Sequence, residues 1–325
     1  MVDLSVKYAG LNLKSPIVVS SSGLTNSVER IEKIASSGAG AVVLKSLFEE
    51  QIQFEISEME AGSDYPEAGD YLKTYARENS IKNYLQLITE TKSAIDIPVI
   101  ASVNCHTSNE WIDFTARMEE AGADAIELNI FYLANDKKKD PREYETVYLD
   151  ILTAVKSKVS IPVMVKLGSH FTNLTWMVDQ LYQRGAAAVV LFNRFYAPDI
   201  SIDDLTMGSS EIFSTPAEIR NSLRWVGILS SEVNKIDIAA STGVHSASGA
   251  VKQLLAGATV VQVCSVLYKN GVQYIKLMNS ELKAWMEKKQ YRSIDEFRGK
   301  MNYSNIENPE EYERAQFIKY FSNHQ

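Results

Sequence analysis

A two-part unit recurs along most of this 325-residue chain: a short apolar run, a polar or glycine-containing turn, and then an amphipathic stretch with helical spacing. The apolar runs include IVVSSSG from Ile17, IPVIASVN ending at Asn104, and IPVMVKLG from Ile161 to Gly168. Continuous apolar runs are typical of parallel strands that are covered on both faces. About eight such units predict an α/β fold, a (β/α)8 barrel, with an open doubly wound sheet as the alternative.

The same pattern predicts where the elements lie. Helices are expected at residues 27–37, 81–93, 111–121, 174–184, 216–231 and 247–256, and another begins near Pro141. Residues 2–15 are expected to form a hairpin that turns at Ala9-Gly10. Residues 47–79 and 194–210 lack periodicity and are predicted to be irregular insertions, and the chain is expected to continue as helices from about Gly271. Since no Gly/Ser-rich linker divides the chain, we expect one domain over residues 1–325.

Composition excludes several classes of function. The net charge is −8 and the pI is about 5.2, so a basic face for nucleic acid is not expected. The two cysteines are far apart, which favours a reducing cytosol over a disulfide scaffold. The N-terminus lacks the features of a signal peptide, and no window approaches the roughly 20 apolar residues of a membrane span. We therefore expect a cytoplasmic protein with no membrane partner.

Functional side chains of such barrels lie where the strands end. Here these positions carry hydroxyls, amides, glycines and lysines but no metal-ligand set: Ser21, Ser22, Gly23, Lys45, Ser46, Asn104, Asn129, Lys166, Asn193, Ser241, Thr242, Gly243, Cys264 and Ser265. Lys166 closes an apolar run, where an unpaired ammonium is costly to bury. It is therefore a candidate to bind an anion or an electron-rich ring. Asparagines can donate to and accept from the edge of a heterocycle.

The last two units indicate a phosphate site. The segment STGVHSASGAVKQLLAGA places a glycine turn before a short helix, and VVQVCS follows as the final strand. Backbone N–H groups at such turns bind phosphate, and barrels often place this site after strands 7 and 8. A second hypothesis uses the same residues as a Schiff-base lyase or aldolase, with Lys166 or Lys45 as the nucleophile and a phosphorylated substrate.

These stretches resemble the class 1 dihydroorotate dehydrogenases, whose fold is an FMN-binding (β/α)8 barrel, from about Ser5 to Ile275. The resemblance rests on IVVSSSG, VVLKS, ADAIELN, IPVMVKLG, VVLFN, and ASTGV followed by LLAGATVVQVCS. It implies an oxidoreductase of pyrimidine biosynthesis that oxidises dihydroorotate to orotate, or acts on a related cyclic substrate, by hydride transfer to flavin N5. It also implies FMN as the cofactor and a homodimer.

The resemblance assigns roles to the strand-end residues. It places Lys45 and Lys166 near the flavin ring and the ribityl chain. It places four polar side chains along the cofactor or substrate edge: Ser22, Asn104, Asn129 and Asn193. It gives the FMN phosphate backbone donors at Gly243, Val244, Cys264 and Ser265. The expected cofactor set is completed by Ser21, Gly23, Ser46, Ser241 and Thr242, and the expected catalytic residues are Lys45, Asn129, Tyr132 and Asn193.

The chain departs from the family where the family carries its base. The family motif is Asn-x-Ser-Cys-Pro-Asn, whose cysteine removes a proton from dihydroorotate, whereas this chain reads NIFYLAN from Asn129 to Asn135. Another group would have to accept that proton, and the candidates are Tyr132, Cys105 and His170. The family's Asn-x-x-Gly-Leu segment is also not visible, and the acidic residues 63–71 would repel a carboxylate substrate. A flavin-binding barrel without this activity is therefore a third hypothesis.

Overall fold

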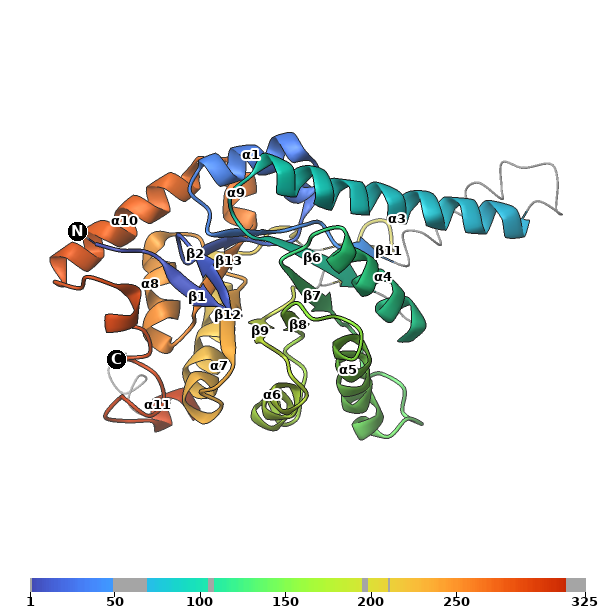
Figure 1. The fold of residues 1–325 in the computed structure, drawn as a ribbon. Helices are drawn as coiled ribbons and strands as arrows, with labels where there is room; N and C mark the ends of the chain where they lie inside the picture. Colours follow the sequence, from blue (N-terminus) through green and yellow to red (C-terminus); the bar gives the residue numbers. More distant parts are fainter. Residues whose placement is uncertain (1, 49–68, 105–107, 195–197, 210, 314–325) are drawn as a thin grey trace.

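Eight parallel strands close into a barrel in the computed structural model, which describes residues 2–48, 69–104, 108–194, 198–209 and 211–313 (Figure 1). Around the barrel, each hydrogen-bonded to the next, they are β3 (Ile17–Val19), β4 (Ala41–Val43), β6 (Val99–Asn104), β7 (Ala125–Asn129), β8 (Val163–Leu167), β9 (Ala188–Leu191), β12 (Asp237–Ser241) and β13 (Val260–Val263). Because β13 pairs with β3 and β4 pairs with β6, the ring is closed. The barrel prediction is confirmed, and the open-sheet alternative is wrong.

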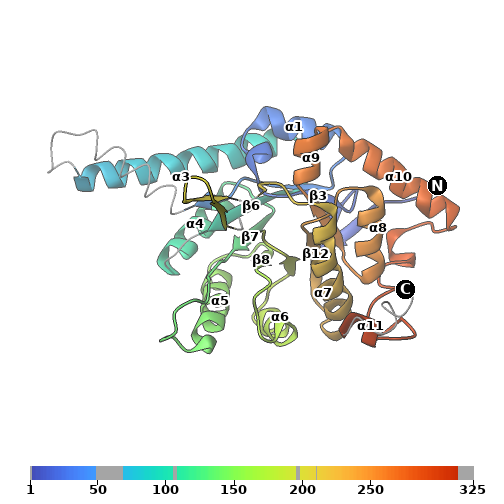
Figure 2. The same cartoon turned by 180° about the vertical axis from the view of Figure 1, so that it is seen from behind.

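Helices surround the barrel (Figure 2). They are α1 (Val28–Ser36), α3 (Gly69–Ala94), α4 (Ser108–Glu120), α5 (Pro141–Lys156), α6 (Leu174–Gln183), α7 (Ile219–Glu232) and α8 (Ala247–Ala256), followed by α9 (Ser265–Asn270), α10 (Tyr274–Lys288) and α11 (Glu310–Glu313). Short 3-10 turns are η1 (Gly23–Thr25), η3 (Pro216–Glu218) and η4 (Ile294–Glu296). The start of α5 shows why the sequence folds this way: Pro141 is in its first turn, and Asp140 and Glu143 form a capping box.

Side chains alternate between the barrel interior and the helix layer along each strand. On β7, Ile126 and Leu128 pack in the outer core with the helices, whereas Ala125 packs in the inner core. The inward-facing residues of β7 are therefore Ala125, Glu127 and Asn129, and this face of the strand becomes polar toward its C-terminal end. The interior changes in this way from an apolar base to a polar layer beneath the strand ends.

The N-terminal hairpin closes the base of the barrel. Its strands are β1 (Val6–Tyr8) and β2 (Leu11–Leu13), which pair antiparallel. Tyr8 is fully buried in the same cluster as the inward-facing side chains. Ala9 and Gly10 have positive φ angles of 50° and 85°, so the predicted turn is confirmed. Polar groups that bind a ligand must therefore lie at the opposite end.

The prediction of an irregular segment over residues 47–79 is wrong in part. Leu47–Phe48 forms β5, which pairs with β6, and α3 already begins at Gly69. The N-terminal part of α3 projects beyond the barrel in both views (Figures 1 and 2). A helix that does not pack along its length needs no continuous apolar face, so periodicity could not reveal it. Among the described residues, no helix is long and apolar enough to cross a membrane.

The second irregular prediction, over residues 194–210, is also wrong in part. Strands β10 (Pro198–Ser201) and β11 (Thr206–Ser209) form an antiparallel hairpin. Its apolar side chains face solvent, as Ile200 is 59% and Met207 is 70% exposed. Alternation identifies a strand only when one of its faces is buried, so this hairpin left no such signal in the sequence.

Candidate functional site

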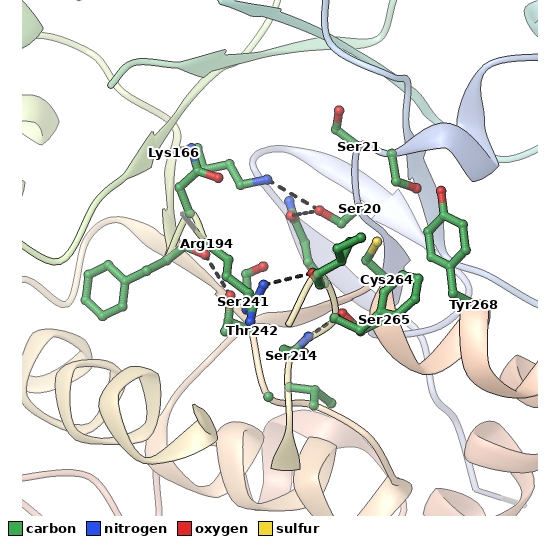
Figure 3. A pocket seen from close by; sticks show the side chains of 18 of the residues that line it. Ser20, Ser21, Lys166, Arg194, Ser214, Ser241, Thr242, Cys264, Ser265 and Tyr268 are labelled. Atoms are coloured by element: carbon green, nitrogen blue, oxygen red, sulfur yellow. Dashed lines mark hydrogen bonds between the residues drawn. The ribbon is translucent and has the colours of Figure 1, made fainter. Parts of the chain in front are cut away.

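A cavity of about 410 Å³ lies at the C-terminal ends of the barrel strands (Figure 3). Its volume falls in the range of small-molecule sites. Many of the residues expected from the sequence line it: Ser21, Ser22, Gly23, Lys166, Asn193, Ser241, Thr242, Gly243, Val244, Cys264 and Ser265. Other lining residues were not expected: Ser20, Phe192, Arg194, Ile212, Phe213, Ser214, Gln262 and Tyr268.

The floor of this cavity is a buried polar network. Lys166 Nζ lies 3.4 Å from Ser20 Oγ and 3.4 Å from Glu127 Oε1. Gln262 Nε2 donates to Glu127 Oε2 at 2.6 Å, and Ser20 Oγ donates to Gln262 Oε1 at 3.1 Å. Sequence analysis treated Lys166 as lacking a partner, and the structure provides one. Glu127 could have been found as the lone carboxylate two residues before Asn129, and therefore on the same face of the strand.

A tight backbone turn at Thr242 and Gly243 forms another part of the cavity lining. Both residues have positive φ angles, 73° and 80°. Thr242 Oγ1 donates to the Phe192 carbonyl at 3.1 Å, which holds the turn. Within the described part of the chain, the N–H groups of Gly243 and Val244 donate to no backbone or side-chain acceptor. Successive free amides of this kind form an anion site.

One wall of the cavity comes from residues 211–215, which we call the strap. Arg194 donates to the carbonyl oxygens of Ile212 and Glu211 at 2.8 and 2.9 Å. Its Nε also forms an ion pair with Glu218 at 2.9 Å. Phe213 packs against Tyr268 of α9, with ring centroids 5.1 Å apart. The strap is thus fastened both to the loop after β9 and to α9.

Ser214 is the central anchor of the strap. Its N–H donates to Ser265 Oγ at 3.0 Å, and its carbonyl accepts from Lys269 at 3.1 Å. Its hydroxyl lies 2.9 Å from Nε2 of His245. Ser265, which the sequence analysis expected at the cofactor phosphate, therefore also holds this wall in place.

The remaining expected residues are not among those that line the cavity. Ser46 Oγ is 3.0 Å from Ser21 Oγ, and Asn193 Nδ2 donates to Asn129 Oδ1 at 2.7 Å, so both Ser46 and Asn129 support lining residues. Three others are half-buried outside the described lining: Lys45, Asn104 and Tyr132. Tyr132 packs edge-on against Tyr148 of α5, with ring centroids 6.2 Å apart. His170 is exposed, and Cys105 lies outside the described residues.

Cys264 is a neutral thiol in this setting. Burial raises its pKa, although a hydrogen bond with Ser22 and the charge of Lys166 act in the opposite direction. A thiol is nucleophilic as the thiolate, so Cys264 is not prepared for covalent chemistry near neutral pH. Its position in the lining agrees with a binding role for its backbone.

His245 is expected to make stability depend on pH. Burial and the charge of Lys269 lower its pKa, against the opposing effects of Glu218 and Ser214. The unfolded chain therefore takes up the proton first as the pH falls, and the free energy of unfolding decreases below about pH 6.5. Urea denaturation should show a larger loss between about pH 7.5 and 5.5 in the native chain than in His245→Gln. Equal losses would contradict this account.

Taken together, the lining of the cavity offers a buried cation, hydroxyls and amides, and two backbone N–H groups that bind no acceptor among the described residues. This arrangement is complementary to a heterocycle that carries a phosphate group. A flavin nucleotide is a molecule of this kind, and the lining offers a cation that suits its ring and backbone donors that suit its phosphate.

Comparison with known proteins identifies the family. The sequence profile described as dihydroorotate dehydrogenase matches residues 69–286. The catalytic subunit of dihydroorotate dehydrogenase B (NAD(+)) from Thermoplasma volcanium is 30% identical over 314 residues, which are 92% of this chain and 98% of that protein. Its counterpart from Thermoplasma acidophilum is 28% identical over 312 residues, 92% of this chain and 99% of that protein. A putative dihydroorotate dehydrogenase A (fumarate) from Aeropyrum pernix is 26% identical over 311 residues, 91% of this chain and 97% of that protein. The chain belongs to the dihydroorotate dehydrogenase family.

Proposed function

We propose that this chain is an FMN-dependent oxidoreductase that oxidises dihydroorotate, or a closely related cyclic amide, in the cavity at the C-terminal end of the barrel. The observation that carries the proposal is the placement of Lys166 and of the free amides of Gly243 and Val244 in the lining of one cavity. When bound, FMN supplies the hydride acceptor, its N5 atom. Membership of the family supports the CH–CH oxidoreductase chemistry.

The residues of the chain divide between holding the cofactor and orienting the substrate. The amides of Gly243 and Val244 would hold the phosphate, and Cys264 and Ser265 line the same cavity. Lys166 would offset negative charge that the ring gains on reduction. The hydrogen-bonded pair of Asn129 and Asn193 is proposed to orient the substrate, and Lys45 is proposed as a further catalytic residue. The other expected cofactor residues support these contacts: Ser21, Ser22, Gly23, Ser46, Asn104, Ser241 and Thr242.

A flavin spectrum tests the proposal directly. The purified protein, or the protein after incubation with FMN, should show the yellow absorbance of bound oxidised flavin. Anaerobic addition of dihydroorotate should then bleach it. Failure to bind FMN would overturn the cofactor assignment. Bound flavin that dihydroorotate does not bleach would overturn the substrate assignment and favour a related cyclic amide or a barrel without this activity.

The Schiff-base hypothesis is less well supported at Lys166. That chemistry requires a neutral amine as the nucleophile. Lys166 is instead held in an ion pair with the buried carboxylate of Glu127 at 3.4 Å. Borohydride trapping with phosphorylated carbonyl compounds should therefore leave Lys166 unmodified.

We propose Tyr132 as the acceptor of the substrate proton, because it follows Asn129 closely at the exit of β7 and is half-buried. An ordinary tyrosine has a pKa near 10, so the rate of flavin reduction by dihydroorotate should rise with pH above neutrality. Tyr132→Phe should reduce that rate by roughly 10²-fold or more at high pH. Stopped-flow absorbance measures the rate. His170→Gln is the matched control, and a larger loss in that variant would transfer the role to His170.

We also propose that the chain forms a homodimer through the β10–β11 hairpin. Four apolar side chains on this hairpin and its turn are strongly exposed: Ile200 (59%), Ile202 (82%), Leu205 (84%) and Met207 (70%). A contiguous exposed apolar surface is typical of an interaction site. Some relatives are named as catalytic subunits, so a different subunit is the competing occupant.

The double substitution Ile202→Ser with Met207→Ser is expected to convert a dimer into a monomer in sedimentation velocity. Leu277→Ser on α10 is the matched control, because Leu277 is also exposed (46%) but lies outside the hairpin. It should leave the dimer intact. A dimer that survives the hairpin substitutions would place the interface elsewhere. A native chain that is monomeric until another subunit is added would replace the homodimer with a heteromeric assembly.

A further inference from the structure

We infer that Glu127 is a positioning residue, which keeps Lys166 charged and directed at the cofactor and thereby sets the affinity and reduction potential of bound FMN. The inference rests on the proposed function, because it concerns the same cavity. It assigns a role to a carboxylate that does not itself line that cavity.

The contacts of Glu127 account for both of its carboxylate oxygens. Oε1 lies 3.4 Å from Lys166 Nζ, and Oε2 accepts from Gln262 Nε2 at 2.6 Å. Ser20 closes the ring, since its hydroxyl accepts from Lys166 and donates to Gln262. Figure 3 shows Lys166 and Ser20 pointing toward one another at the floor of the cavity. Ser20, just after β3, and Glu127 on β7 thus contact the ammonium, and Gln262 on β13 binds both of them.

The strand register places Glu127 below Lys166, toward the base of the barrel. Asn129 of β7 pairs with Lys166 of β8, so Glu127 lies one inward-facing step closer to the base of the barrel. The Glu127 side chain is completely buried, whereas that of Lys166 keeps 7% of its surface exposed. Lys166 also lines the cavity, whereas Glu127 does not. The positive end of the ion pair therefore faces the ligand, and the negative end is enclosed by protein.

Three titratable side chains lie close enough to this pair to feel its charges: Lys166 acts on Cys264, and Glu127 acts on Tyr84 and Tyr8. Burial raises the pKa of all three groups, so each is neutral near pH 7. The charge of Lys166 therefore depends on Glu127, because a buried ammonium without a counter-ion tends to lose its proton.

Replacement of the Glu127 carboxylate by an amide should remove the effect of the Lys166 charge on the flavin. Glu127→Gln is expected to lower the reduction potential of bound FMN in the same direction as Lys166→Met. It should also weaken FMN binding by roughly tenfold or more, as for the loss of a charged hydrogen-bonding group. The double variant Glu127→Gln with Lys166→Met should show no further lowering beyond Lys166→Met alone, because the loss of Glu127 lowers the potential only through Lys166. Potentials are measured by equilibration with a redox dye, and FMN affinity by quenching of flavin fluorescence.

A pH series distinguishes the loss of the Lys166 charge from a change in side-chain packing. As the pH falls, Lys166 in Glu127→Gln regains its proton, so the difference in potential from the native protein should shrink. The difference between Lys166→Met and the native protein should persist at every pH. A potential that is unchanged or raised in Glu127→Gln, or shifts that add in the double variant, would overturn the inference.

Further variants guard against a purely structural effect. Glu127→Asp keeps the charge and should restore most of the native potential. Asp237→Asn removes a carboxylate at the opposite end of the barrel, where it accepts from Ala9 N and from Thr259. It should lower the melting temperature without moving the potential. If Glu127→Gln does not fold, Glu127→Asp is compared in the native and Lys166→Met backgrounds, and a shift that persists without Lys166 would overturn the inference.

The two proposals fail in different ways. If the native protein binds no FMN, the proposed function is wrong and the potentials cannot be measured. If it binds FMN and the Glu127 variants do not follow the Lys166 variant, only the role of Glu127 is wrong.

Discussion

Replacement of Gly243 by alanine is expected to abolish FMN binding and to destabilise the fold by about 3 kcal/mol or more. Gly243 has a φ of +80°, which costs an alanine roughly 1 kcal/mol or more. The new Cβ would also lie 2.1 Å from Ile219 N and 2.7 Å from the carbonyl carbon of Glu218. These are backbone atoms at the start of α7, so they cannot move aside as the tip of a side chain could. The turn must shift, and its free amides would move with it.

Gly10→Ala provides the matched control. Gly10 has a φ of +85°, but a Cβ added there meets nothing within 4 Å. It should therefore lose only the cost of the positive φ, about 1 kcal/mol, and keep its affinity for FMN. Urea denaturation gives both free energies of unfolding, and fluorescence titration gives both affinities. Similar losses of stability and of FMN affinity in Gly243→Ala and Gly10→Ala would show that overlap of the new Cβ with backbone atoms does not cause the effect at Gly243.

The barrel and many of its lining residues could be predicted because two physical signals coincide. Buried parallel strands require continuous apolar runs, and the first polar residue after each run marks its C-terminal end. The carboxyl ends of all eight strands meet at one face, so residues as distant as Ser21 and Ser265 could be assigned to one site. The resemblance to a known family added FMN as the expected cofactor, which no spacing in the chain reveals.

The remaining lining residues had no such signal. Arg194, Ser214 and Tyr268 come from the segments after β9, before α7 and within α9, and tertiary packing brings them together. A continuous apolar run also conceals which of its residues face inward. The partner of Lys166 was therefore missed, although period two relates Glu127 to Asn129 once either is placed inside the barrel.

Lys166→Met is expected to cost about 3–5 kcal/mol of stability in the FMN-free protein, in addition to weakening FMN binding. The reason is the carboxylate that remains: Glu127 is completely buried, and without Lys166 its one hydrogen bond from the described residues is that of Gln262. A buried charge that loses its counter-ion retains the full cost of its removal from water. Urea denaturation without added flavin isolates this effect from the contribution of ligand binding.

The comparison with Lys92→Met decides whether burial or distance controls the result. Lys92 lies only 2.7 Å from Asp124, but the two side chains are 33% and 27% exposed. Water screens that pair, so its loss should cost about 1 kcal/mol or less. Loss of the Lys166–Glu127 pair, at 3.4 Å, should therefore cost more stability than loss of the shorter Lys92–Asp124 pair. Distance alone predicts the opposite order. Adding Glu127→Gln to Lys166→Met removes the stranded charge and should recover most of the lost stability. Equal costs for the two lysine variants, or no recovery in the double variant, would mean that the floor of the cavity is hydrated and that Glu127 and Lys166 are not a buried charge pair.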